Sequence, residues 1–178
     1  MVIALIVVVV LFMASPDSLA SGEVSPDFCK EALPKPLASL ISVRFHQWKI
    51  MSDEWLGGYE EYYRKERPTG CPGVVGLDLY GNGKRVFAIS ILRESTKGLK
   101  SKLLLAEQDK SKTWVVKTLW NDECDCVVMS VPPGEDTDVG RGHRIAGVGE
   151  GIVFLKYEAY AIVFRWTGKK VEHVYVMD

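Results

Sequence analysis

Histidine is the side chain best suited to acid–base chemistry near neutral pH, and the sequence holds three of them. His143 lies in a polar, glycine-rich segment between Arg141 and Arg144, where a nearby acid would make it a general base. His46 belongs to a helical pattern and His173 to a strand pattern. The sequence has no G-x-S-x-G, H-E-x-x-H or P-loop motif. We therefore expect no enzyme activity and no cofactor, and we keep as an alternative a cell-envelope hydrolase that uses His143 with a loop carboxylate.

The segment 132–144 around this histidine is a candidate partner-binding loop. It begins with two prolines, is rich in acidic residues, and belongs to a connection of about 20 residues between predicted strands. Connections of this length in a small domain are functional or disordered. We predict that the loop binds another protein and that complementary charge steers the association. The candidate contact residues are Glu135, Asp136, Asp138, Arg141, His143 and Arg144.

The four cysteines, Cys29, Cys71, Cys124 and Cys126, predict two disulfides in an oxidising compartment. Cys124 and Cys126 are one residue apart, and a bond between them would close a very small ring. We therefore expect each of them to pair with Cys29 or Cys71, with the connectivity left open. The C-x-C pair has no histidine or further cysteine nearby, so we expect no zinc site.

An apolar run at the start of the chain predicts export. Residues 2–14 are almost all apolar, a length that suits the hydrophobic region of a signal peptide and is below the roughly 20 residues that cross a bilayer. The small residues Ser18 and Ala20 place the cleavage after Ala20. We expect residues 1–20 to be a signal peptide and residues 21–178 to be a single periplasmic or secreted domain that does not contact the membrane after cleavage. The alternative is a buried N-terminal strand.

The most specific local string runs from Asp78 to Lys84 and reads D-L-Y-G-N-G-K. It resembles the calcium-binding hairpin of FG-GAP and VCBS-type repeats, in which side-chain oxygens at loop positions one, three, five and nine hold the ion. Asp78 and Asn82 match positions one and five, whereas Tyr80 and Val86 at positions three and nine cannot supply a carboxylate. The resemblance therefore implies a hairpin built on an Asn-Gly turn, and a calcium-stabilised adhesion module is the alternative. A wider pattern consists of an N-terminal helix with Cys71-Pro72-Gly73, this hairpin, and a C-terminal Trp-turn-strand that ends in Asp. It resembles uncharacterised exported bacterial proteins, and this resemblance implies no particular activity.

The elements that position these candidate residues begin with two predicted helices. Apolar residues recur at helical spacing over 33–48, and Pro34 and Pro36 suit a helix entrance. A second helical pattern runs from after Ser52 to residue 67, and its apolar stripe consists of Trp55, Leu56, Tyr59, Tyr62 and Tyr63. We expect this helical part, 33–67, to cover one face of a sheet.

The sequence pattern of residues 74–178 predicts β-strands. Glycine- and asparagine-rich turns separate the strands and favour antiparallel neighbours, with a tight reversal near Glu158. We expect an α+β fold, in which the N-terminal helices pack on a mainly antiparallel β-sheet in a meander. The predicted strands are 74–79, 85–93, 101–108, 113–120, 126–131, 152–158, 160–166 and 171–177.

The net charge of the chain is −1, which argues against a nucleic-acid partner. The charge is nevertheless unevenly distributed. Residues 84–117 hold nine basic and three acidic residues, a balance of +6, and residues 121–150 hold two basic and seven acidic residues, a balance of −5. Together these features predict an exported, non-enzymatic protein-binding domain. Its most concrete form is an inhibitor or immunity-type protein that blocks an envelope-targeting toxin or hydrolase with the 132–144 loop.

Overall fold

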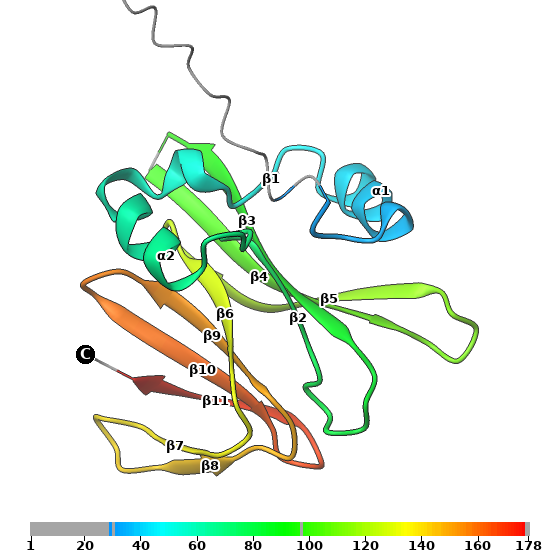
Figure 1. The fold of residues 1–178 in the computed structure, drawn as a ribbon, viewed down its shortest axis with the longest axis vertical. Helices are drawn as coiled ribbons and strands as arrows, with labels where there is room; N and C mark the ends of the chain where they lie inside the picture. Colours follow the sequence, from blue (N-terminus) through cyan, green and yellow to red (C-terminus); the bar gives the residue numbers. More distant parts are fainter. Residues whose placement is uncertain (1–28, 30, 97, 177–178) are drawn as a thin grey trace, which may run out of the picture.

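The computed structural model describes residue 29 and residues 31–96 and 98–176; the predicted signal peptide, 1–20, lies outside this part. The described chain is β-rich, with mostly antiparallel sheets and two short α-helices (Figure 1). No helix in these residues is long and apolar enough to cross a membrane. The elements are α1 (Lys35–Arg44), β1 (Lys49–Ile50), the 3-10 helices η1 (Asp53–Trp55) and η2 (Gly57–Tyr59), α2 (Glu60–Glu66), β2 (Val74–Leu77), β3 (Val86–Ser95), β4 (Gly98–Gln108), β5 (Trp114–Asp122), β6 (Val127–Val131), β7 (Glu135–Thr137), β8 (Arg144–Ala146), β9 (Gly151–Lys156), β10 (Tyr160–Trp166) and β11 (Val171–Val176).

The strands form two larger sheets instead of the single sheet that the sequence predicted. In the first, sheet A, the order is β1-β3-β4-β5, and β2 also pairs with β3. In the second, sheet B, the order is β11-β10-β9-β6, and β7 and β8 form a separate hairpin. All paired strands in the two sheets run antiparallel, and the predicted reversal near Glu158, whose φ is 55°, joins β9 to β10. The single-sheet prediction was wrong because the chain leaves sheet A after β5 and begins sheet B at β6.

The main core lies between the two sheets. Alternate residues of β3 and β4 face sheet B, as strand geometry requires, and meet apolar residues of β6, β9 and β10. Two polar contacts join the sheets where β2 approaches β6. The Val128 N–H donates to the Pro72 carbonyl at 2.8 Å, and the buried Ser90 hydroxyl donates to the Cys126 carbonyl at 2.7 Å. The core residues include Leu77, Ala88, Leu103, Leu105, Val128, Ile152, Phe154, Ile162 and Phe164.

Each sheet has a cover on its outer face. Leu37 and Ile41 of α1 are buried against the outer face of sheet A. Ile145 of β8 is buried with Val153 and Val163 on the outer face of sheet B. The described residues therefore stack as helix, sheet A, sheet B and hairpin, and the hairpin that covers sheet B is the predicted partner-binding segment.

The two helices are shorter than the ranges predicted for them. After Arg44 the chain turns, and Lys49–Ile50 pairs with β3 in place of a fourth helical turn. Gly57 has a φ of +55°, outside the right-handed helical region, so residues 53–59 form two 3-10 turns before α2 begins. The aromatic stripe is also divided, because Tyr63 is buried and Tyr62 is 69% exposed.

All four cysteines form disulfides, as predicted, but their predicted pairing was wrong. Cys29 bonds to Cys71, and Cys124 bonds to Cys126. An extended strand places alternate Cα atoms about 6.6 Å apart. The chain bends between β5 and β6, so that the Cα atoms of Cys124 and Cys126 are only 5.2 Å apart.

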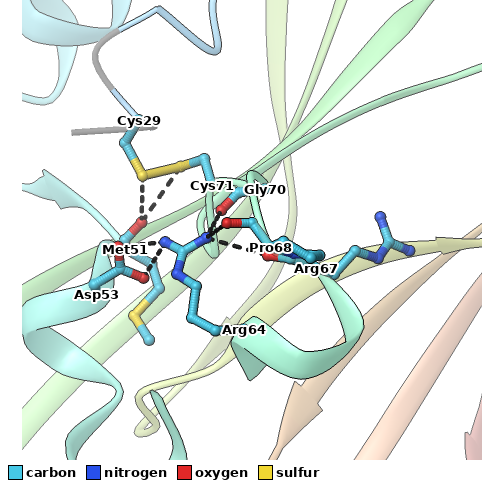
Figure 2. Close-up of a disulfide and its surroundings, with 8 residues drawn as sticks. All are labelled: Cys29, Met51, Asp53, Arg64, Arg67, Pro68, Gly70 and Cys71. Carbon is cyan, nitrogen blue, oxygen red and sulfur yellow. Dashed lines mark hydrogen bonds and ion pairs between the residues drawn. A yellow bond between two sulfur atoms is a disulfide. The ribbon is translucent and has the colours of Figure 1, made fainter. Parts of the chain in front are cut away.

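An arginine holds the loop that carries Cys71. Figure 2 shows the Arg64 guanidinium below the Cys29–Cys71 bond, pointing at the carboxylate of Asp53 and at the backbone carbonyls of residues 67, 68 and 70. The bond to the Gly70 carbonyl is 2.7 Å long. The two disulfide sulfurs lie 3.5 and 3.7 Å from the Met51 carbonyl oxygen. The disulfide and the arginine together fix the helical part of the chain to the start of β2.

Candidate functional site

The segment predicted as a long loop is an ordered hairpin, so that prediction was wrong. Strands β7 and β8 pair antiparallel, and the Asp138 N–H donates to the His143 carbonyl at 2.7 Å. The tip between them turns at Gly142, whose φ of +63° suits glycine. Both strands have only three residues, and the acidic β7 (Glu135–Thr137) has low β-propensity, so contacts distant in sequence hold this hairpin in place.

The strongest of these contacts is an ion pair between Asp136 and Arg165 of β10. The Arg165 side chain is only 3% exposed, and its Nε donates to Asp136 Oδ2 at 2.5 Å. Its Nη1 also donates to the Pro132 carbonyl at 2.6 Å. A Cβ at Gly147 or Gly151 would lie 2.5 Å or 2.9 Å from atoms of the Arg165 side chain. These glycines therefore leave space for the Arg165 side chain, and Asp136 anchors the hairpin to β10 through it.

Asp138 organises the tip of the hairpin and attaches it to β11. Its Oδ1 accepts the N–H groups of Gly140 (3.0 Å) and Arg141 (2.8 Å), and its Oδ2 accepts the N–H of Tyr175 (3.3 Å). The Val139 N–H donates in turn to the Tyr175 carbonyl at 3.2 Å. Desolvation raises the pKa of Asp138, but these N–H donors and the Arg141 charge outweigh it and hold the pKa below its ordinary value.

The other predicted contact residues lie on the hairpin surface. Glu135 and Arg144 form an exposed cross-strand ion pair of 3.2 Å. The acid nearest His143 is Glu172 of β11, with 3.9 Å between Nε2 and Oε2. Arg141 is exposed at the tip. All three loop carboxylates therefore have partners within the chain, and the hydrolase alternative would pair His143 with Glu172 instead of a loop acid.

A cavity of about 740 Å³ is lined by the hairpin tip and by residues of β10 and β11. Val139, Arg141 and His143 line it from the tip, and Tyr160, His173 and Tyr175 line it from the two strands. The hairpin and β11 lie next to each other at the lower left of Figure 1. The structure thus brings Asp138, Arg141 and His143 together in one wall, and it leaves Glu135, Asp136 and Arg144 outside the lining.

Aromatic residues from both sheets support the strand side of this cavity. A register shift between β4 and β5 falls near Trp120, whose ring lies 4.8 Å from His173 and 6.2 Å from Tyr175. Asp122 accepts hydrogen bonds from Trp120 Nε1 (3.1 Å) and from the Tyr160 hydroxyl (2.6 Å). Burial and this carboxylate raise the pKa of Tyr160, so its hydroxyl stays a hydrogen-bond donor. These residues were not predicted from the sequence, because nothing local shows that β5 meets β10 and β11.

The calcium-like string forms the predicted hairpin turn between β2 and β3. Asp78 uses both carboxylate oxygens on the turn itself, accepting the N–H groups of Asn82 at 3.0 Å and Gly83 at 2.8 Å. Among the residues that the structure describes, no group of three or more His, Cys, Asp or Glu side chains could hold a metal ion. The Asp78 carboxylate thus stabilises the backbone of the turn.

The Asp138 carboxylate is expected to make the hairpin acid-sensitive, which can be measured by comparing the protein with Asp138→Asn. The folded state lowers the pKa of Asp138 below its ordinary value of 3.8. Its contribution to stability is therefore complete above that pH and is lost as the pH falls through the lower, folded-state pKa. We expect the difference in Tm between the two proteins to be constant from about pH 5 to pH 7 and to shrink below about pH 3.8. An unchanged difference at about pH 2.5 would contradict the role of the carboxylate.

Comparison of the chain with models of protein families, with curated proteins and with solved structures finds no match. The hairpin tip and the cavity beside it are therefore the features from which a function can be inferred. The lining combines one guanidinium, one carboxylate, two imidazoles and two phenol rings around a preformed cavity.

Proposed function

We propose that this protein is an exported, non-enzymatic domain that binds a segment of another protein between the β7–β8 hairpin and strands β10 and β11. The observation that carries the proposal is the 740 Å³ cavity, whose wall combines aromatic, histidine and arginine side chains at the tip of a fixed hairpin. Pockets of this size bind ligands by apolar contact with a few placed polar groups. Arg141 and His143 of the predicted contact set take the direct role, and Asp136 and Asp138 position them.

The composition of the wall supports a protein partner. Tyrosine and arginine are enriched at protein–protein interfaces and account for much of their binding energy. Val139 is 58% exposed and Tyr175 is 41% exposed, so two large apolar side chains next to the cavity face solvent. An exposed apolar patch with a polar rim is typical of an interaction surface.

The rigidity of the hairpin supports an inhibitor-like or immunity-type role. Asp138 ties the tip to β11, and the ion pair of Asp136 with Arg165 ties its base to β10. A preorganised loop loses little conformational entropy on binding, which favours affinity. We propose that the hairpin and the cavity beside it bind a segment at the active site of an envelope-targeting toxin or hydrolase and so block that site.

The two disulfides support a periplasmic or secreted location. Disulfides persist in oxidising compartments and are rare in the cytosol. Cys71, Cys124 and Cys126 are buried, so both bonds belong to the folded core. An exported inhibitor would meet an envelope enzyme in this compartment.

Photo-crosslinking at the cavity tests the proposal. Val139 is replaced by a photoreactive phenylalanine analogue, and the exposed Val43 of α1 receives the same replacement as the control. We expect one protein from an envelope extract of the producing cells to crosslink to position 139 and not to position 43. In the protein that carries the photoreactive residue at position 139, Arg141→Glu should weaken this association about tenfold, or about 1.4 kcal/mol. Lys65→Glu on α2, an exposed site with the same charge change, should leave it unchanged.

Two results would count against the proposal. One is equal crosslinking from positions 139 and 43, which would indicate non-specific contact. The other is an adduct at position 139 that Arg141→Glu leaves unaltered, since the partner would then not use the cavity.

A further inference from the structure

A second cavity, of about 550 Å³, lies between the β2–β3 turn and the β4–β5 turn, where four basic residues gather. Lys84 and Arg85 come from the first turn, and Lys110 and Lys112 come from the second. All four are exposed, and within the described part of the chain none of them belongs to an ion pair. We refer to this hollow as the basic cleft. The two turns project to the lower right in Figure 1, away from the β7–β8 hairpin.

The carboxylates in the basic cleft do not neutralise these cations. Glu107 accepts hydrogen bonds from Lys117 Nζ and from the Tyr80 hydroxyl, each at 2.6 Å. Asp109 Oδ1 accepts the N–H groups of Ser111 and Thr113, both at 2.9 Å, which closes its own turn. The four basic side chains therefore leave a positive field open to a ligand.

Contacts within the chain fix the positions of two of these basic residues, Arg85 and Lys84. The Arg85 guanidinium lies 5.4 Å from the ring centroid of Phe87 and directly over Gly76, where a Cβ would come within 2.1 Å of its Nε. The Asn82 side chain accepts the Lys84 N–H at 3.0 Å, so the turn that Asp78 organises fixes the backbone of Lys84. A guanidinium that is positioned without an acidic partner is suited to bind an anion from outside the chain.

Aromatic side chains contribute to the lining of the basic cleft. Trp114 is partly exposed, and its ring lies 5.7 Å from that of Phe87 in an edge-to-face arrangement. Tyr80 lies on the other side, with its hydroxyl directed at Glu107. The cleft thus offers an aromatic surface to an apolar face and cations to anionic substituents.

We propose that the basic cleft binds an acidic glycan, a saccharide chain that carries carboxylate, sulfate or phosphate groups. The pyranose ring has an apolar face that stacks on tryptophan, and its anionic substituents would reach the cations of both turns. An acidic peptide would meet the same cations but has no flat apolar ring face to place on the partly exposed Trp114, so this tryptophan favours a saccharide. The site is separate from the hairpin cavity and does not depend on the function proposed for it.

Calorimetric titration with heparin and with oligogalacturonate, a sulfated and a carboxylated glycan, tests the proposal. We expect Lys84→Glu/Lys110→Glu to weaken binding at least tenfold. The control, Lys65→Glu/Lys169→Glu, changes the net charge equally at two exposed sites outside the cleft and should leave affinity within twofold. Trp114→Leu should weaken glycan binding severalfold, and its circular dichroism and unfolding curve report whether it remains folded. Neutral dextran should not bind.

Three results would overturn the proposal. Equal weakening in the two double variants would show that only net charge matters. Binding of poly-L-glutamate as tight as that of the glycans, with the same loss in Lys84→Glu/Lys110→Glu, would assign the cleft to acidic peptides. If neither glycan binds at low salt, where surface electrostatic interactions are strongest, the cleft does not bind acidic glycans.

Discussion

Replacing Asp136 with alanine is expected to lower the free energy of unfolding by about 3–4 kcal/mol. The reason is the partner that the substitution leaves behind. The Arg165 side chain is 3% exposed, so without Asp136 its charge stays buried, and within the described residues the Pro132 carbonyl is the acceptor that remains. Removal of one member of a buried ion pair costs far more than the pair itself contributes. Chemical denaturation followed by fluorescence or circular dichroism measures the loss.

Two further variants separate this effect from the loss of surface charge. Glu135→Ala removes the neighbouring carboxylate, whose ion pair with Arg144 is exposed, and should cost less than about 1 kcal/mol. Adding Arg165→Met to Asp136→Ala removes the stranded charge and should recover much of the lost stability. Equal costs for Asp136→Ala and Glu135→Ala, with no recovery in the double variant, would contradict an anchoring ion pair.

The Cys29→Ala/Cys71→Ala variant is expected to be about 4 kcal/mol less stable than the native protein. The bond joins residues 42 positions apart, and a closed loop of that length strongly restricts the unfolded chain. It also ties the segment before α1 to the loop that Arg64 holds. Guanidinium titration of both proteins under non-reducing conditions gives the difference.

The second disulfide supplies a matched comparison. Cys124→Ala/Cys126→Ala opens a ring in which the cysteines are only two positions apart, so the entropic loss should be about 1.5 kcal/mol. Cys71, Cys124 and Cys126 are all buried, so the loss of side-chain contacts affects both variants. The prediction is wrong if opening the 124–126 ring destabilises the protein more than opening the 29–71 loop.

The strands and turns were predictable from the sequence because their signals are local. Each of the eight predicted strands has a counterpart in the structure, with ends shifted by a few residues. Alternation of apolar residues and turn residues such as Asn82 and Gly168, whose φ is 90°, marks these elements. The antiparallel pairing then follows from the short connections.

The division into two sheets was not predictable in the same way. The bend at Cys124 and Cys126 redirects the chain, yet in sequence the segment reads as a short link between two strands. The β7–β8 hairpin was missed because each strand has only three residues, β7 is acidic, and an arginine from the distant β10 holds the hairpin. Positive φ at Gly57 likewise divided a pattern that was read as one helix.

The candidate site was predictable only in part. Arg141 and His143 were expected to contact a ligand, and both line the cavity at the hairpin tip. Asp136 and Asp138 were expected to contact the partner, but both carboxylates bond to groups of this chain, Asp136 to Arg165 and Asp138 to the backbone of β11. Tyr160 and Tyr175 complete the wall from β10 and β11, and no local pattern distinguishes them from other strand residues.

The Cys29–Cys71 bond also determines what a protease can do to this protein. The chain between the two cysteines contains α1, β1, both 3-10 turns and α2, and some of it, such as Tyr62, is well exposed. A cut at such a position breaks one peptide bond but leaves the two fragments joined through sulfur. Leu37 and Ile41 would still cover sheet A. A protease can therefore cut the helical part of the chain without releasing it from the β-sheets.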